Sequence, residues 1–333
     1  MSRTVFFDTT GGPDVLQLAD EPLTEPAPHE VRVRLQAAGL NRLDAMMRSG
    51  ASPRPFRLPH ARLGCEGTGI VDAIGADVDT VSVGDAVIIT AVPDMDVRGT
   101  YAEHTVVPAE RVIARPAGLD PVAAAALWVS FSTAYGALVE KAGMRPDDTV
   151  LITAASSSVG LAAIQIANQL GAVPLAVTRH TEKKAALLAA GATGVIVSDE
   201  ESVPDGARSH TGGVGADIII ASVMGPGLAE LATAARPGGT LLTVGWLDPR
   251  PASMPQNAPL TIYRYMSFEH VLDPAVVRRI AAFLTAGLRT GALRPTVAEV
   301  FPLDEVVTAH ETLERGDHLG KLVLAIDGTV TPA

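Results

Sequence analysis

The first third of the chain alternates short apolar runs with turns rich in glycine and proline. β-branched residues dominate these runs, and short runs of this composition are typical of β-strands. Because the runs are short and irregularly spaced, they predict an irregular β-barrel. The expected strands are Val31–Ala38, Gly67–Ile74, Asp85–Thr90 and Tyr101–Val107.

The pattern changes near Pro121, where an Ala-rich stretch through Lys141 favours helix and suggests a domain boundary. From Thr149 onward, near-continuous apolar runs alternate with helix-like segments, which is typical of a parallel sheet covered on both faces. We therefore expect a doubly wound α/β domain. Its expected strands are Thr149–Ala154, Val173–Thr178, Gly194–Val197, Asp217–Ser222 and Gly239–Gly245, and its expected helices are Val159–Leu170, Glu182–Ala190 and Leu228–Ala235.

The last part of the chain breaks this alternation. A strand is expected at Ser267–Val271, helices at Pro274–Arg289 and Asp304–Arg315, and a final strand at Lys321–Ile326. The mixed order suggests that this tail returns to the first domain. We therefore expect a substrate domain made of residues 1–121 and 272–333, and a nucleotide-binding domain made of residues 122–271.

Length and charge narrow the class of protein. A chain of 333 residues is long enough for about two domains. The net charge of −11, without any long run of Lys or Arg, argues against a nucleic-acid partner. No apolar stretch is long enough for a membrane span, and the first residues do not have the order of a signal peptide. We expect a cytoplasmic protein that does not bind membranes.

A single cysteine, Cys65, excludes an intramolecular disulfide and a metal site built from several thiolates.

The turn between the first strand and the first helix of the second domain is a candidate phosphate-binding site. In a dinucleotide-binding turn, small residues expose backbone amides at a helix N-terminus, which attracts the pyrophosphate. The sequence here retains only the last glycine of the G-x-G-x-x-G pattern. An ordinary serine-capped helix start is the alternative interpretation. The residues expected to face the pyrophosphate are Ser156, Ser157, Ser158, Val159 and Gly160.

The end of the second strand indicates which cofactor is bound. A carboxylate usually stands there to bind the adenosine ribose, but this chain has Thr178, followed by Arg179 and Lys183. Positive charge without a carboxylate favours the 2′-phosphate of NADPH over NADH. The alternative is that these charges lie on a solvated helix face. Two further strand ends are expected near the nicotinamide, and they carry Ser222, Val223, Gly245 and Trp246.

The motifs together resemble those of the medium-chain dehydrogenase/reductase superfamily, in its zinc-free quinone oxidoreductase and enoyl reductase branch. The resemblance covers nearly the whole chain. It implies a GroES-like barrel, a Rossmann domain, hydride transfer from NAD(P)H to a small-molecule substrate, and a homodimer, for which we expect contact near Met266–Val271. The motifs are AAGLNRLDAMMRSG (37–50), LGCEGTGIVDAIG (63–75), VGDAV (83–87), GTYAEHTVVPAERV (99–112), FSTAYGAL (131–138), RPGGTLLTVG (236–245) and GKLVL (320–324).

The same resemblance bears on metal chemistry. In the metal-dependent relatives a catalytic zinc has three protein ligands, and the matching positions here are Asn41, Cys65 and Val129. These residues do not supply three ligands, so we expect no zinc. Without a Lewis acid, alcohol oxidation loses its main stabilisation, and reduction of a quinone or of the C=C of an α,β-unsaturated carbonyl compound is favoured. Two alternatives stay open: an alcohol or ketone dehydrogenase of the same superfamily, and a catalytically silent NADPH-binding protein.

Four further side chains have candidate roles. Asn41 is expected to donate a hydrogen bond to the acceptor oxygen or to the nicotinamide ribose, unless it only caps a turn. Cys65 is either a proton donor or an inert core residue. The resemblance places Thr133 beside a cofactor phosphate. Lys321 either reaches the cofactor or is an exposed lysine at the start of a strand.

Overall fold

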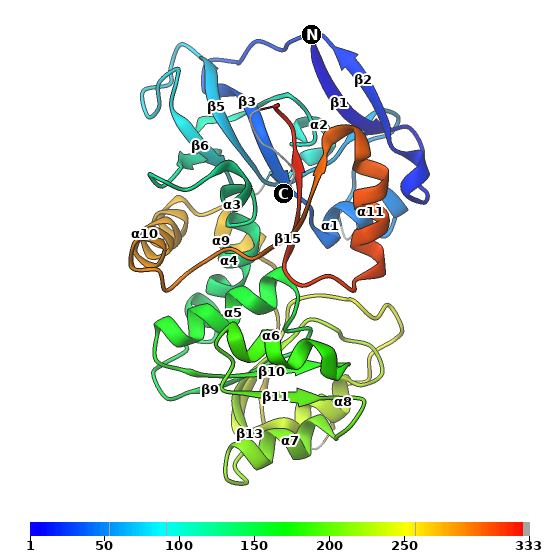
Figure 1. Cartoon of the computed structure of the whole chain (residues 1–333), viewed down its shortest axis with the longest axis vertical. Coiled ribbons are helices and arrows are strands. Elements are labelled where there is room, and N and C mark those ends of the chain that lie inside the picture. Colours follow the sequence, from blue (N-terminus) through cyan, green and yellow to red (C-terminus); the bar gives the residue numbers. More distant parts are fainter. Residues whose placement is uncertain (53, 91, 257, 329–333) are drawn as a thin grey trace. The chain divides into compact units, whose positions relative to one another are not determined.

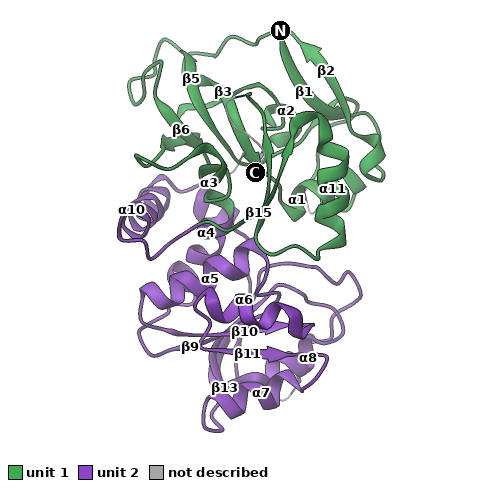
Figure 2. Ribbon diagram, viewed as in Figure 1, with its two compact units in different colours: residues 1–129, 295–333 green, residues 130–294 purple. Residues whose placement is uncertain are grey.

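A computed structural model of the protein describes residues 1–52, 54–90, 92–256 and 258–328. The chain forms two compact units (Figure 2). We call residues 1–129 with 295–333 the barrel unit, and residues 130–294 the sheet unit.

These limits differ from the predicted domains, which ended at 121 and resumed at 272. The segment 272–294 belongs to the sheet unit because helix α10 (Pro274–Thr290) packs there. The Phe283 and Tyr135 rings lie 4.9 Å apart, and Arg279 forms an ion pair with Glu140 at 2.8 Å.

The sheet unit contains six parallel strands in the order β11-β10-β9-β12-β13-β14. Numbered within this sheet, that order is 3-2-1-4-5-6, the arrangement of doubly wound dinucleotide-binding folds. The predicted fold class is therefore confirmed (Figure 1). The strands are β9 (Thr149–Ile152), β10 (Val173–Thr178), β11 (Gly194–Val197), β12 (Ala216–Ala221), β13 (Ala235–Thr243) and β14 (Thr261–Arg264), and the helices between them are α5 (Ser158–Gln169), α6 (Lys184–Ala189), α7 (Val203–His210) and α8 (Leu228–Leu231).

The predicted helix through Pro121–Lys141 is divided into three pieces. These are α3 (Pro121–Ala125), α4 (Trp128–Tyr135) and a π-helical turn, Gly136–Lys141. A side chain at Gly136 would place its Cβ 2.0 Å from the Tyr265 hydroxyl, so this close approach requires glycine.

The predicted strand at Ser267–Val271 is wrong, because the chain forms helix α9 (Phe268–Val271) and the last strand of the sheet is β14. The Glu269 carboxylate accepts hydrogen bonds from the Met266 amide, at 3.2 Å, and from the Tyr263 hydroxyl. These bonds close the chain into a turn directly after the strand.

The barrel unit contains two sheets. One has the order β2-β1-β4, and the other has the order β15-β16-β3-β5-β6-β8, with β7 paired to β3. On β3, Val31, Val33 and Leu35 are buried while the intervening arginines are not, which is the period-two pattern of a half-buried strand. The strands are β1 (Ser2–Phe7), β2 (Gln17–Glu21), β3 (Glu30–Gly39), β4 (Ala61–Arg62), β5 (Gly67–Ile74), β6 (Ala86–Ile89), β7 (His104–Pro108), β8 (Val112–Ala114), β15 (Val297–Pro302) and β16 (Lys321–Ala325), and the remaining helices are α1 (Arg42–Ser49), α2 (Met95–Arg98) and α11 (Val306–Arg315).

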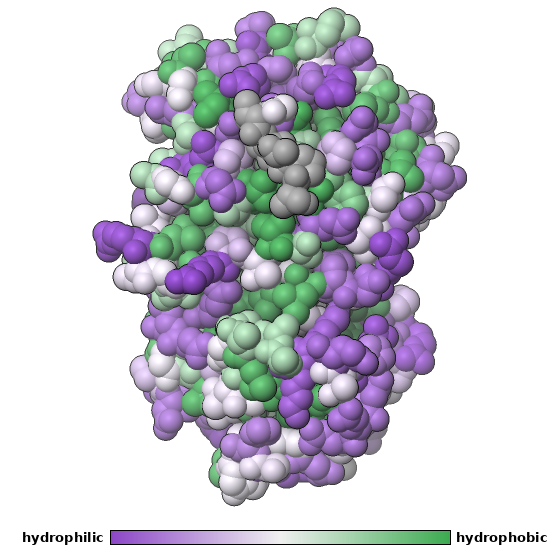
Figure 3. Space-filling model, viewed as in Figure 1, coloured by the Kyte–Doolittle hydropathy of each residue, from purple (hydrophilic) through white to green (hydrophobic). Residues whose placement is uncertain are grey.

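Polar and apolar residues are interspersed on the face of the molecule drawn in Figure 3. Within the described ranges, no helix combines the length and the apolar character needed to cross a lipid bilayer.

Candidate active site

The predicted phosphate-binding turn joins β9 to α5. Ser157 caps the helix, because its hydroxyl oxygen accepts a hydrogen bond from the Gly160 amide at 3.1 Å. Gly160 packs closely against the turn that precedes the helix: a Cβ there would lie 2.6 Å from both the Cα and the carbonyl oxygen of Ala155. Glycine at this position therefore allows the close approach of the helix start to the turn. The turn therefore fits a pyrophosphate, and Ser158 and Val159 begin the helix that would face it.

Two predicted cofactor residues from separate segments meet at this turn. The Lys183 ammonium group donates a hydrogen bond to the Ser156 hydroxyl at 3.3 Å, which brings a cation to the phosphate-binding turn. Thr178 ends β10, and its hydroxyl donates to the carbonyl oxygen of His180 at 3.4 Å. Arg179 follows and is exposed. The nearby Asp199 carboxylate lies 3.0 Å from His180, with which it forms an ion pair. Thr178 is thus followed by an exposed arginine, and the nearby Asp199 carboxylate is paired with His180.

The ends of β12 and β13 also lie together. The Ser222 amide donates to the Thr153 hydroxyl at 2.8 Å, and the Ser222 carbonyl accepts from the Leu247 amide at 3.2 Å. A Cβ at Gly245 would lie 2.9 Å from that carbonyl oxygen.

Next to these strand ends, Val223 and Trp246 are partly exposed. The Arg264 guanidinium group lies 3.0 Å from the centre of the Trp246 ring, so this tryptophan is a packing partner of Arg264. Thr133 lies in α4 and is mostly buried.

In the barrel unit, four side chains form a buried polar cluster: Asn41, Cys65, Glu66 and Lys321, which we call the barrel cluster. They come from the residue before α1, the residues before β5 and the first residue of β16. Lys321 is 2% exposed and Glu66 is 1% exposed, and the two form an ion pair. The expectation of an exposed lysine at this strand start is therefore wrong.

The barrel cluster fixes the direction of the Asn41 amide group. The Lys321 ammonium group can only donate, so the Asn41 atom that it contacts at 2.6 Å is the oxygen Oδ1. The amide nitrogen Nδ2 therefore points inward, toward the Glu66 carboxylate at 3.1 Å, the Gly39 carbonyl at 3.2 Å and the Cys65 sulfur at 3.4 Å. Both N–H groups of Asn41 have partners inside the barrel unit, so in this arrangement neither is available to an acceptor oxygen.

A second buried acid, Asp44, supports the cluster from α1. Its carboxylate accepts hydrogen bonds from the Asn41 amide at 2.7 Å and from the Tyr101 hydroxyl at 2.8 Å. Burial raises the pKa of Asp44 to about 6, although the Tyr101 hydrogen bond opposes this effect. Burial also raises the pKa of the Cys65 thiol, with further contributions from Asp44 and Glu66. The thiol is therefore neutral and poorly nucleophilic.

The three positions that match metal ligands of the relatives do not form a zinc site. Val129 has no donor side chain, and its backbone amide donates to Glu66 at 2.7 Å. Asn41 uses its amide on its neighbours, and the Lys321 ammonium group is bonded between Asn41 and Glu66, where it would repel a cation. In the described part of the chain, no group of three or more His, Cys, Asp or Glu side chains is placed to hold a metal ion.

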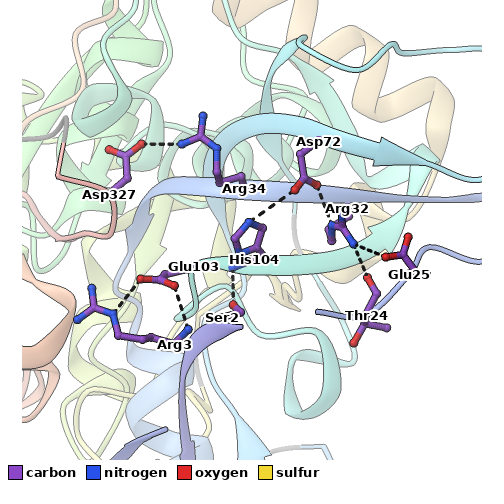
Figure 4. Close-up of polar contacts among 10 residues, drawn as sticks. All are labelled: Ser2, Arg3, Thr24, Glu25, Arg32, Arg34, Asp72, Glu103, His104 and Asp327. Atoms are coloured by element: carbon purple, nitrogen blue, oxygen red, sulfur yellow. Dashed lines mark hydrogen bonds and ion pairs between the residues drawn. The ribbon is translucent and has the colours of Figure 1, made fainter. Parts of the chain in front are cut away.

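A separate polar cluster lies on strands β1, β3, β5 and β7 of the barrel unit and includes Glu103, the residue before β7 (Figure 4). Asp72 lies between Arg32, at 2.9 Å, and His104, at 3.6 Å, and Arg3 pairs with Glu103 at 2.8 Å. Charges of both signs are paired within this cluster, so we assign it a structural role.

Glu66 is the member of the barrel cluster that the sequence analysis did not single out. It contacts three segments that are far apart in the sequence, and only the fold brings them together. No local pattern in the sequence connects Glu66 with Lys321, because their pairing depends on the fold.

Comparison with known proteins identifies the family of the chain. The profile of the alcohol dehydrogenase GroES-like domain matches residues 27–117, and the profile described as zinc-binding dehydrogenase matches residues 190–324. A quinone oxidoreductase of Lama guanicoe is 31% identical over 333 residues, covering 98% of both chains. The chain belongs to the medium-chain dehydrogenase/reductase superfamily, in its quinone oxidoreductase branch.

Solved structures of the superfamily agree with this assignment. The Escherichia coli quinone oxidoreductase complexed with NADPH has a TM-score of 0.90 and 27% identity, covering 98% of this chain and 100% of that one. An NAD-dependent alcohol dehydrogenase has a TM-score of 0.85 and 32% identity, also covering 98% of this chain and 100% of that one.

Proposed function

We propose that this member of the superfamily is an NADPH-dependent reductase that transfers hydride to a quinone or to the C=C of an α,β-unsaturated carbonyl compound, without a metal. The observation that carries the proposal is the barrel cluster. Where metal-dependent relatives bind zinc, this chain has an amide, a neutral thiol and an apolar residue, with a lysine ammonium group bonded beside them. An activated acceptor can be reduced there, because it needs a positioned hydride and only modest polarisation of its oxygen.

The sheet unit supplies the proposed cofactor site. Bound NADPH would supply the hydride from its nicotinamide ring. We propose that Ser156 to Gly160 hold the pyrophosphate at the start of α5, where the helix dipole favours an anion. Arg179 and Lys183 would bind the 2′-phosphate, near Thr178.

The strand ends at Ser222, Val223, Gly245 and Trp246 would flank the nicotinamide, with Thr133 near a cofactor phosphate. The NADPH-bound relative from Escherichia coli supports this choice of cofactor.

A second candidate function is an alcohol or ketone dehydrogenase. The NAD-dependent alcohol dehydrogenase with 32% identity favours it, because sequence identity to that protein is as high as to the quinone oxidoreductases. The donor set of the barrel cluster argues against it, since an alkoxide would have no metal ion to stabilise it.

We also propose a homodimer in the cytoplasm, as in the sequence analysis. The expected contact segment Met266–Val271 is not a strand, but β14 lies at the edge of the six-stranded sheet, where a strand of a second copy could pair with it. Sedimentation of the purified chain at micromolar concentration tests this proposal, and a monomeric mass would contradict it.

The experiment that tests the proposed function follows NADPH and NADH absorbance with a panel of quinones, enones, ketones and alcohols, with zinc measured on the same sample. We expect oxidation of NADPH by a quinone or an enone, unchanged by a chelator. About one zinc per chain with chelator-sensitive alcohol oxidation would favour the second function. Binding of NADPH without turnover of any acceptor would indicate a silent cofactor-binding protein.

A further inference from the structure

A cation without an acidic partner lies at the carboxyl end of the sheet. Arg264 is the last residue of β14 and lies beside Thr243 of β13, at the edge where both parallel strands end. Ligands of open α/β sheets bind outside this edge. The Arg264 nitrogen Nη1 is buried and has no hydrogen-bond partner within the described ranges. Leaving a buried donor of a charged group unpaired is costly, so an anionic ligand at Arg264 would be stabilised.

Two carboxylates of the neighbouring segments already have partners of their own. Asp248, in the loop after β13, forms an ion pair with Arg250 at 2.6 Å. Glu269, which follows β14, accepts two hydrogen bonds within its own turn. Burial lowers the pKa of Arg264, and no carboxylate among the described residues opposes this effect. The side chain as a whole is only partly buried, so its charge is accessible to a ligand from solution.

Exposed apolar side chains accompany Arg264 at this edge. Its guanidinium group lies over the Trp246 ring, 3.0 Å from the ring centre, and Trp246 is itself 38% exposed. Val223, Leu247 and Met266 follow the ends of β12, β13 and β14, which are neighbouring strands, and each is more than a third exposed. Apolar surface around a single cation suits a ligand that has an apolar body and one anionic group.

The proposed cofactor does not use this charge. Its phosphates are assigned to the start of α5 and to Arg179 and Lys183. The nicotinamide ring, which we place near these strand ends, has no anionic group and becomes positively charged when NADPH is oxidised. The anion at Arg264 therefore belongs to the acceptor. A planar guanidinium group matches a carboxylate, to which it donates two parallel hydrogen bonds, and it can do so while stacked on an aromatic ring.

We propose that Arg264 binds a carboxylate carried by the acceptor, and that Trp246 holds the guanidinium group in position. The preferred acceptor is then an enone or a quinone that has a carboxylate attached to an apolar body. This inference rests on the proposed function, which supplies the class of acceptor. The carboxylate takes no part in hydride transfer, so Arg264 determines which acceptor binds and not how it reacts.

A binding experiment tests this site without turnover. The probe is benzoate, and benzamide is its neutral counterpart of similar shape. The chain has two tryptophans, and Trp128 is fully buried in the barrel unit, so Trp246 fluorescence reports a probe bound at Arg264. We expect benzoate to change the fluorescence of the wild-type chain saturably, with a Kd about tenfold or more below that of benzamide. Trp246→Phe should remove the signal.

Variants and turnover test the role of the charge. Arg264→Gln is expected to raise the Kd of benzoate about tenfold and to leave the Kd values of benzamide and NADPH unchanged. Arg236→Gln is the control, because Arg236 lies near the opposite end of β13 and is paired with Asp217. With NADPH, the acceptor pair is 3-benzoylacrylate and its methyl ester. Arg264→Gln should raise the KM of the acid about tenfold, without changing its kcat or the KM of the ester.

The proposal is overturned if benzoate binds the wild-type chain no more tightly than benzamide, or if Arg264→Gln binds both probes as the wild type does. A raised Kd of NADPH in Arg264→Gln would also overturn it, because the charge would then serve a cofactor phosphate. The comparison of the two probes on the wild-type chain does not depend on how well any variant folds.

Failure of this proposal and failure of the proposed function give different results. A chain that reduces no acceptor, but whose Trp246 fluorescence shows the preference for benzoate, contradicts the proposed function and leaves the carboxylate site standing. A chain that reduces the acid and the ester, with KM values that Arg264→Gln does not change, supports the proposed function and overturns the carboxylate site.

Discussion

Replacement of Asp44 by Asn separates the charge of this buried group from its hydrogen bonds. Asp44 is fully buried, and its pKa is raised from 3.8 to about 6, chiefly by burial. A group whose pKa is raised by folding contributes stability that is fully present below its unfolded pKa and is lost as the pH rises through the folded pKa. The loss therefore occurs between pH 3.8 and about 6.

The size of the effect follows from the same values. The two pKa values differ by 6 − 3.8, or about 2.2, and at about 1.36 kcal/mol per unit this corresponds to about 3 kcal/mol. An Asn side-chain oxygen can still accept from the Asn41 amide and the Tyr101 hydroxyl. Its NH₂ group replaces an Asp44 oxygen that has no partner within the described ranges, which costs a roughly pH-independent 1–3 kcal/mol. The free energy of unfolding of Asp44→Asn, minus that of the wild type, should therefore rise by about 2–3 kcal/mol between about pH 4 and pH 7.

The two tryptophans make this measurable in the barrel unit alone. Trp128 is fully buried there, and Trp246 belongs to the sheet unit. In a Trp246→Phe background, urea unfolding followed by Trp128 fluorescence reports on the barrel unit, and the difference between the two proteins cancels all other titrating groups. A difference that stays constant between these pH values would refute the assignment of a buried, titrating charge to Asp44.

Three further predictions concern the proposed cofactor site and the thiol. Gly160→Ala should destabilise the sheet unit by about 1–3 kcal/mol and weaken NADPH binding, because its Cβ would lie 2.6 Å from backbone atoms of Ala155. Gly227→Ala is the control, since a Cβ at that position would have nothing within 4 Å. Equal unfolding midpoints for the two variants would contradict this prediction. Lys183→Met should raise the Kd of NADPH about tenfold and leave that of NADH unchanged, as measured by cofactor fluorescence; equal losses for both cofactors would rule out a contact with the 2′-phosphate. Cys65 should react with iodoacetamide only after unfolding, because it is buried and its pKa is raised, and rapid alkylation of the folded protein, detected by mass spectrometry, would show otherwise.

The sequence predicted the sheet unit better than the barrel cluster. Apolar runs such as Val173–Thr178 and Gly194–Val197 coincide with strands, because a strand buried on both faces has to be apolar throughout. Ser267–Val271 was misassigned as a strand, since the turn there depends on the Glu269 side chain and not on a local pattern of apolar residues.

The inward orientation of Asn41 could not be predicted either, because it depends on contacts across the fold. Asn41 and Lys321 are 280 positions apart in the sequence, and no local pattern connects them. The resemblance to metal-dependent relatives identified the positions of the metal ligands. It could not show that the Lys321 ammonium group lies beside them, because this depends on the pairing of β16 with β3.

The Glu66–Lys321 pair also limits how this chain can evolve. A route to a metal site would have to change Asn41, Cys65 and Val129 and also remove the lysine. Removing Lys321 first would strand the Glu66 carboxylate in the interior, and removing Glu66 first would strand the ammonium group. Either single step costs about 3–5 kcal/mol, a large fraction of the stability of an ordinary domain. Each variant that lacks only one member of the pair is thus less stable than the proteins before and after it in such a series. The buried pair therefore opposes the stepwise evolution of a metal site at this position.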